Sequence, residues 1–157
     1  MKLLLMAVGK TTQHLMRQGI DLYLERLRHY LPVEVEIIAD VKKTASLTSE
    51  KQKELEGEQI LRRIEPGDRL ILLDENGREM TSREFAGYME KQMAAGGKRL
   101  VYVVGGPYGF SQAVYARADS KLSLSRMTFN HEMVRLFFVE QLYRSQTILR
   151  GEPYHHD

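Results

Sequence analysis

The chain has 157 residues, 43% of them hydrophobic, which fits one compact domain spanning residues 1–157. It contains no cysteine, which excludes disulfides, thiolate zinc sites and a cysteine nucleophile and agrees with a cytoplasmic location. Its 23 basic and 21 acidic residues leave a formal net charge of +2, so the whole chain exerts little long-range attraction on a polyanion.

The first part of the chain is predicted to alternate between strand and helix. Residues 2–8 form an apolar run that is too short to span a membrane and lacks a signal-peptide cleavage pattern, so we predict a buried strand. Residues 13–31 carry apolar side chains at helical spacing, and Pro32 closes this helix. In residues 33–37 valine and isoleucine alternate with glutamate, which predicts a strand with one wet face near a sheet edge.

The middle of the chain continues in the same way. We expect the lysine-rich residues 42–54 to be mobile and residues 55–64 to form a helix, which a proline and a glycine then stop. Residues 70–73 are another apolar run, typical of a buried strand, and they lead into a turn at residues 76–77.

Helix-capping residues mark the second half. Thr81 and Glu84 have the spacing of a capping box, so a helix should begin there and end at two consecutive glycines. The elements predicted after it are a strand (residues 100–104), a short helix (111–118), a strand (121–124) and a final helix (132–147). Such alternation predicts an α/β domain with a largely parallel sheet.

Two loops at the carboxyl ends of predicted strands offer a ligand site. Residues 105–109 read Gly-Gly-Pro-Tyr-Gly, and residues 124–129 mix small, polar and apolar side chains, although the second loop alone also fits an ordinary half-buried connection. Open α/β sheets bind ligands at this edge, which favours a cleft here. A P-loop is excluded because Leu4 stands where that motif needs a glycine before Gly9, and the glycines of residues 105–109 miss the dinucleotide-binding spacing.

The last residues are unusual for a chain end. Residues 151–157 read Gly-Glu-Pro-Tyr-His-His-Asp, whereas termini are normally unspecialised, so an aromatic ring and two imidazoles there favour a functional site. A metal site would have to combine His131 with the tail. We expect none, because the adjacent His155 and His156 point apart in an extended chain and no helical H-x-x-x-H spacing occurs.

Taken together, several of these segments resemble one known family. They are Ala7-Val8-Gly9-Lys10, Leu73-Asp74 through Gly77 to Thr81-Ser82, Gly105-Gly106-Pro107-Tyr108-Gly109, Leu122-Ser123-Leu124-Ser125-Arg126-Met127-Thr128, His131, Arg135, Glu140-Gln141, Tyr143-Arg144 and Gly151-Glu152-Pro153-Tyr154-His155. In this order they resemble the SPOUT methyltransferases that methylate N3 of a pseudouridine in large-subunit ribosomal RNA. Ser145 departs from the alanine expected there. The resemblance covers the whole chain and implies the SPOUT α/β-knot fold: a mostly parallel sheet flanked by helices, a C-terminal trefoil knot and a homodimer.

The same resemblance implies S-adenosylmethionine as the cofactor. Its binding residues would be Leu73, Gly105, Leu124, Ser125, Arg126, Met127, Thr128 and Phe129. These residues belong to the carboxyl ends of predicted apolar strands and to both loops, so the resemblance and the predicted cleft point to the same edge of the sheet.

The residues singled out for the chemistry are Arg144, Tyr154 and His155. The N3 atom of a uracil ring must lose a proton, and Arg144 is expected to stabilise the negative charge that develops, although an exposed helical ion pair would also explain this residue. His155 would accept the proton and Tyr154 would stack on the base, unless both only hold the tail in place.

A small site without an RNA-binding domain needs a substrate that is presented by a larger particle, which agrees with the near-zero net charge. The resemblance implies helix 69 of 23S rRNA on the assembled ribosome, with no membrane and no metal involved. Two alternatives remain open: a ribosome-associated binding module that has lost transfer, and a SPOUT enzyme that acts on tRNA.

Overall fold

The computed structural model describes residues 1–42 and 46–157. Within this part of the chain, five strands form a parallel sheet in the order β2-β1-β4-β3-β5. The strands are β1 (Lys2–Val8), β2 (Val33–Ile38), β3 (Arg69–Glu79), β4 (Arg99–Val104) and β5 (Ser120–Ser123). The helices are α1 (His14–Leu27), α2 (Ser49–Arg62), α3 (Ser82–Ala94), α4 (Gln112–Arg117) and α5 (His131–Leu149). The prediction of an α/β fold with a mostly parallel sheet is confirmed.

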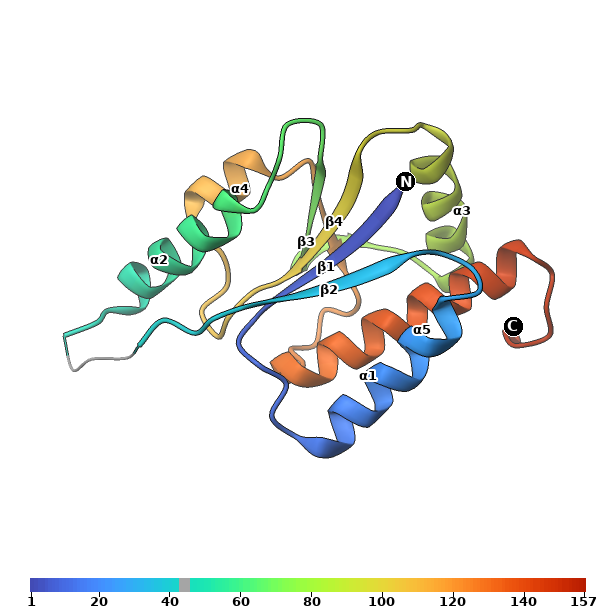
Figure 1. The fold of residues 1–157 in the computed structure, drawn as a ribbon, viewed down its shortest axis with the longest axis horizontal. Coiled ribbons are helices and arrows are strands. Elements are labelled where there is room, and N and C mark those ends of the chain that lie inside the picture. Colours follow the sequence, from blue (N-terminus) through green and yellow to red (C-terminus); the bar gives the residue numbers. More distant parts are fainter. Residues whose placement is uncertain (43–45) are drawn as a thin grey trace.

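Helices cover both faces of the sheet (Figure 1). Helices α1, α3 and α5 pack on one face, and α2 and α4 pack on the other. Because side chains alternate along a strand, Leu3 and Leu5 of β1 point into the first core, and Leu4 and Met6 point into the second. A central strand buried on both faces must be apolar throughout, which explains why β1 reads as one continuous apolar run.

Two predictions for the first part of the chain need correction. Helix α1 ends at Leu27 rather than at residue 31, and a turn follows it in which the backbone N–H of Tyr30 donates to the carbonyl of Leu27, three residues back. β2 is an edge strand as predicted, but its apolar side chains do not form a dry face. Val35 and Ile37 are 41% and 39% exposed on this edge strand, which has a neighbouring strand on one side only.

The lysine-rich stretch at residues 42–54 is only partly described. Residues 43–45 lie outside the described residues, so their mobility stays a prediction. From Ser49 onward the chain forms α2, earlier than the predicted start at residue 55. Thr48 explains this start because its hydroxyl oxygen accepts a hydrogen bond from the backbone N–H of Lys51 at 3.1 Å, which caps the helix.

The later elements follow the predictions closely. Helix α3 begins with both hydrogen bonds of the capping box, from the Glu84 N–H to the Thr81 hydroxyl and from the Thr81 N–H to the Glu84 carboxylate, at 3.1 and 2.7 Å. Ser111 caps α4, and α5 covers the whole of the predicted final helix. β5 begins at Ser120, one residue earlier than predicted.

No helix of the described part of the chain is long and apolar enough to cross a membrane. The C-terminal trefoil knot stays a prediction from the resemblance. What the fold fixes directly is the edge of the sheet at which β3, β4 and β5 end, because these three strands are neighbours and run in the same direction.

Candidate functional site

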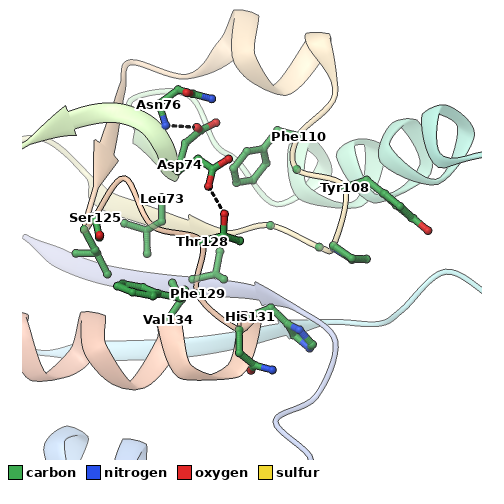
Figure 2. A pocket seen from close by; sticks show the side chains of 18 of the residues that line it. Leu73, Asp74, Asn76, Tyr108, Phe110, Ser125, Thr128, Phe129, His131 and Val134 are labelled. Carbon is green, nitrogen blue, oxygen red and sulfur yellow. Dashed lines mark hydrogen bonds between the residues drawn. The ribbon is translucent and has the colours of Figure 1, made fainter.

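A cleft of about 590 Å³ opens at the carboxyl ends of β3, β4 and β5. Figure 2 shows the side chains that surround it. Its apolar wall includes Leu73, Val104, Leu122, Leu124, Phe129 and Val134. Its polar groups include Asp74, Glu75, Asn76, Ser125, Thr128 and His131. A partly apolar cleft with a few polar groups, placed at this edge of a parallel sheet, is typical of a ligand site.

An irregularity in β3 forms one wall of the cleft. Leu73 and Arg78 both lie opposite Leu122 of β5, so the intervening residues 74–77 leave the ladder. Gly77 permits this close approach, because a Cβ atom at that position would lie 2.7 Å from the backbone nitrogen of Leu122. The turn predicted for residues 76–77 is therefore a bulge within a longer strand.

The bulge presents two carboxylates at the cleft. Asp74 accepts a hydrogen bond from the hydroxyl of Tyr115, and burial together with this bond raises the pKa of Tyr115 to about 12. Glu75 accepts a hydrogen bond from the hydroxyl of Thr128 at 2.7 Å. This second bond ties the bulge to the loop of residues 124–129, so the two walls of the cleft support each other.

Aromatic side chains hold the two predicted loops in place. A Cβ atom on Gly105 would lie 3.0 Å from the ring of Phe110, so a glycine lets the ring pack closely against the start of the loop after β4. Phe129 packs edge-to-face against Phe137 of α5, with 5.2 Å between the ring centroids. This contact anchors the apolar end of residues 124–129 on α5.

A second group of candidate residues lies near the other end of α5. The guanidinium carbon of Arg144 is 4.8 Å from the centre of the Tyr154 ring, and Nη1 of Arg144 is 3.1 Å from Nδ1 of His155. Burial lowers the pKa of Arg144, but the hydrogen-bonded Glu140 carboxylate raises it by more, so the net shift is upward. For Tyr154, burial raises the pKa, and its hydrogen bonds to Tyr23 and Glu140 raise it in the same direction. The three predicted catalytic residues are thus brought together.

This cluster is separate from the cleft within one chain. His131 and Val134 line the cleft, whereas Arg144, Tyr154 and His155 do not. Arg144 follows Val134 by ten residues of α5, which corresponds to about 15 Å along a helix axis. In the described part of the chain, no three His, Asp or Glu side chains group together as metal ligands.

Comparison with known proteins places the chain in a family. A family model described as "Predicted SPOUT methyltransferase" matches residues 1–155. The chain belongs to the SPOUT methyltransferase family. It is 54% identical to "Ribosomal RNA large subunit methyltransferase H" of Parabacteroides distasonis, over the full length of both chains. Proteins with the same name from Porphyromonas gingivalis and Bacteroides fragilis are 53% and 52% identical, also over their full lengths.

A solved structure agrees with this SPOUT methyltransferase in fold. It is that of a probable methylase family protein from Haemophilus influenzae, with a TM-score of 0.53 over 99% of this chain and 70% of the other. The two sequences are 12% identical, so the likeness concerns the fold alone.

In this SPOUT methyltransferase, the cleft contains seven of the eight residues predicted for the cofactor. They are Leu73, Gly105, Leu124, Ser125, Met127, Thr128 and Phe129. The exception is Arg126, whose side chain is 86% exposed and pairs with Glu79 at 3.3 Å. Sequence reasoning gave no role to Asp74 or Glu75, although both carboxylates directly follow the apolar run of residues 70–73 and so lie at the ligand-binding edge of the sheet.

Proposed function

We propose that this SPOUT methyltransferase transfers the methyl group of S-adenosylmethionine to N3 of a pseudouridine in helix 69 of 23S rRNA, on assembled cytoplasmic ribosomes. The observation that carries the proposal is the full-length identity of 52–54% to proteins named ribosomal RNA large subunit methyltransferase H. The order of motifs from the first strand to the tail supports the assignment to a pseudouridine N3.

The residues of the cleft suit S-adenosylmethionine in their chemistry. Leu73, Leu124 and Phe129 offer apolar surface to an adenine ring. Asp74 and Glu75 offer acceptors for ribose hydroxyls and for the ammonium group, and their negative charge suits a cationic ligand. When bound, the cofactor supplies a methyl group on a positively charged sulfur, which an acceptor nitrogen attacks in line.

The chain's own residues prepare the acceptor in this proposal. Arg144 carries a permanent charge that stabilises the negative charge on the carbonyl oxygens next to N3 as the proton leaves. His155 accepts that proton directly or through water. Tyr154 offers a ring for stacking on the base, an interaction worth about 1–3 kcal/mol.

We further propose that the protein acts as a homodimer in which the tail of one copy completes the cleft of the other. The ten-residue separation of Arg144 from Val134 along α5 supports this arrangement. Exposed apolar side chains on α1 and α5, two helices that pack against each other, offer apolar surface to a second copy. They include Leu15, Leu22, Met133 and Phe137, which are 71%, 49%, 38% and 38% exposed.

Mixing two defective variants tests the shared site. Arg144→Ala removes the charge from the tail cluster, and Phe129→Ala damages the cleft. If the site is shared, mixed dimers hold one intact site each, so that activity returns when the two proteins are mixed and allowed to exchange. A mixture as inactive as its components would mean either that both residues belong to a site within one chain or that the copies do not exchange. Size measurements on differently tagged copies separate these outcomes, because they show whether mixed dimers form.

The substrate is tested with labelled S-adenosylmethionine and three acceptors: ribosomes that lack the mark, a naked helix 69 hairpin and bulk tRNA. We expect transfer to the ribosomes, little transfer to the hairpin, and N3-methylpseudouridine by mass spectrometry of the nucleosides. Transfer to tRNA alone would favour the tRNA enzyme, and ribosome binding without transfer would favour the non-catalytic module. Arg144→Ala should lower kcat and spare the Kd for S-adenosylmethionine; a collapse of cofactor binding would reassign Arg144.

A further inference from the structure

A chain of hydrogen bonds runs from the end of α5 into the tail, and the Glu140 carboxylate is at its centre. One carboxylate oxygen accepts from Nε and Nη2 of Arg144, at 3.1 and 2.6 Å. The same oxygen accepts from the hydroxyl of Tyr154 at 2.9 Å. The side chains of Arg144 and Glu140 are 24% and 18% exposed, so the pair is largely shielded from water. Two of the three nitrogen atoms of the guanidinium are therefore fixed by Glu140.

The orientation of Glu140 is itself fixed by its neighbour. Its second oxygen accepts from Nε2 of Gln141 at 2.9 Å. The side-chain oxygen of Gln141 accepts in turn from the hydroxyl of Ser82, the first residue of α3, at 2.8 Å. Both carboxylate oxygens are thus engaged, and the network joins α5 to α3 as well as to the tail.

The third nitrogen of the guanidinium determines where His155 carries its proton. Nη1 of Arg144 lies 3.1 Å from Nδ1 of His155. A guanidinium can only donate, so Nδ1 must accept, and the neutral imidazole carries its proton on Nε2. The other side of the ring agrees, because Nε2 lies 2.6 Å from a carboxylate oxygen of Asp157, which also pairs with Arg83. One tautomer of His155 satisfies both neighbours.

We propose that Glu140 is a positioning residue: by holding Nε and Nη2 of Arg144, it places Nη1 over Nδ1 of His155 and keeps that nitrogen covered until an acceptor base arrives. This inference rests on the proposed function. A carbonyl oxygen of the base, as it gains negative charge, is a stronger acceptor for Nη1 than a neutral imidazole. With Nε and Nη2 still held by Glu140, Nη1 of Arg144 therefore donates to the base in place of His155, which exposes the lone pair on Nδ1.

The proton step then balances within these groups. The N3–H bond of the base breaks, an Nδ1–H bond forms on His155, and the electron pair stays on N3, which becomes the nucleophile. The resulting imidazolium keeps its Nε2–H bond to Asp157, and the carboxylates of Asp157 and Glu140 offset the positive charges of Arg144 and Arg83. Charge stabilisation and exposure of the base are thus coupled through one arginine.

The tautomer of His155 is measured by NMR of the imidazole nitrogens, independently of any activity. The protein is labelled with ¹⁵N-histidine, the His155 signals are assigned by comparison with His155→Ala, and spectra are recorded near pH 8.5, about two units above the ordinary histidine pKa. We expect an unprotonated Nδ1 and a protonated Nε2 in the wild-type protein. A protonated Nδ1 would overturn the proposal without any variant having to fold.

Glu140→Gln tests whether the carboxylate does the positioning. We expect a mixture of His155 tautomers and a kcat at least about tenfold lower, with the Kd for S-adenosylmethionine unchanged within twofold. Glu140→Asp keeps the charge and should recover part of kcat, which loss of packing alone would not explain. Glu25→Gln is the matched control, because Glu25 of α1 also pairs with an arginine, Arg28, but both side chains are mostly exposed. Glu25→Gln should change neither the tautomer of His155 nor kcat.

The results separate this inference from the proposed function. If the wild-type tautomer is as expected but no acceptor is methylated, the assignment to rRNA fails and the positioning of Arg144 stands. If ribosomes are methylated and Glu140→Gln keeps the wild-type kcat, or leaves a single His155 tautomer, the positioning role of Glu140 is overturned.

Discussion

Replacement of Arg135 by methionine is expected to destabilise the protein by about 2–4 kcal/mol. Arg135 lies on α5 and is only 2% exposed. Its guanidinium donates to the backbone carbonyls of Gly9 and Val8, at 2.7 and 2.8 Å, and to the hydroxyl of Thr11 at 3.0 Å. These three bonds hold the loop after β1 against α5. Methionine keeps the apolar part of the side chain and removes every donor.

The expected magnitude follows from two opposing contributions. Each buried carbonyl that loses its donor costs about 1–3 kcal/mol, which gives roughly 2–6 kcal/mol for Val8 and Gly9. Removal of the buried charge offsets part of this loss in the free energy of unfolding. Burial lowers the pKa of Arg135 although the carboxylates of Glu132 and Asp40 favour its charged form, so the guanidinium is costly to bury. The net loss is therefore placed in the lower half of the range.

Urea denaturation followed by circular dichroism measures this loss. In thermal unfolding of a chain of this length, a loss of about 3 kcal/mol in the free energy of unfolding corresponds to a fall in Tm of roughly 6–12 °C. Arg126→Met is the matched control, because the Arg126 side chain is 86% exposed and its ion pair should contribute less than about 1 kcal/mol. A change below about 0.5 kcal/mol in Arg135→Met would refute the view that this arginine anchors α5.

Three further predictions concern the cleft and acid stability. Gly77→Ala should weaken S-adenosylmethionine binding by at least about tenfold in calorimetry, because its Cβ would meet the backbone of β5 at 2.7 Å; unchanged affinity would contradict the bulge as a wall of the cleft. Phe129→Ala should weaken the same binding by about 1–3 kcal/mol, whereas Arg126→Ala should change it less than twofold. Burial raises the pKa of Asp68, but the hydrogen bonds that Arg99 donates to its carboxylate outweigh this and lower the pKa below its ordinary value. The stabilisation by this ion pair is therefore present above the ordinary pKa of Asp68 and is lost as pH falls below about 4. The stability difference between the wild type and Asp68→Asn in urea should therefore shrink from pH 6 to pH 3, and a constant difference would count against this pair.

Local signals predicted those elements whose burial or capping depends on adjacent residues. β1 and β4 lie in the middle of a parallel sheet, so apolar runs are sufficient to identify them. The capping box of Thr81 and Glu84 likewise depends on four consecutive residues. Leu31 marks the limit of this reasoning. It is 3% exposed although α1 has already ended, so helical spacing indicated which side chain is buried but not the path of the backbone.

Only those features of the candidate site that follow from the topology of the sheet could be predicted from the sequence. The loops at residues 105–109 and 124–129 meet because parallel strands end at one edge of the sheet, and this rule requires only the order of strands and helices along the chain. The bulge at residues 74–77 depends on how β3 pairs with β5, which no local pattern reveals. The partners of Arg144 depend on the way the tail folds back along α5. The sequence therefore indicated which residue types carry the chemistry, but not the hydrogen bonds between them.

Helix α5 sets the spacing between these parts of the molecule. Near its start Glu132 accepts hydrogen bonds from the backbone N–H groups of Thr12 and Gln13, at 2.7 and 3.0 Å, and Arg135 holds the same loop from the next turn. Near its end Arg144 holds the tail. A helix with both ends anchored is stiff, so α5 holds the tail cluster at a fixed distance from the cleft of its own chain. In the proposed homodimer, the same stiffness would keep the tail of one copy in register with the cleft of the other.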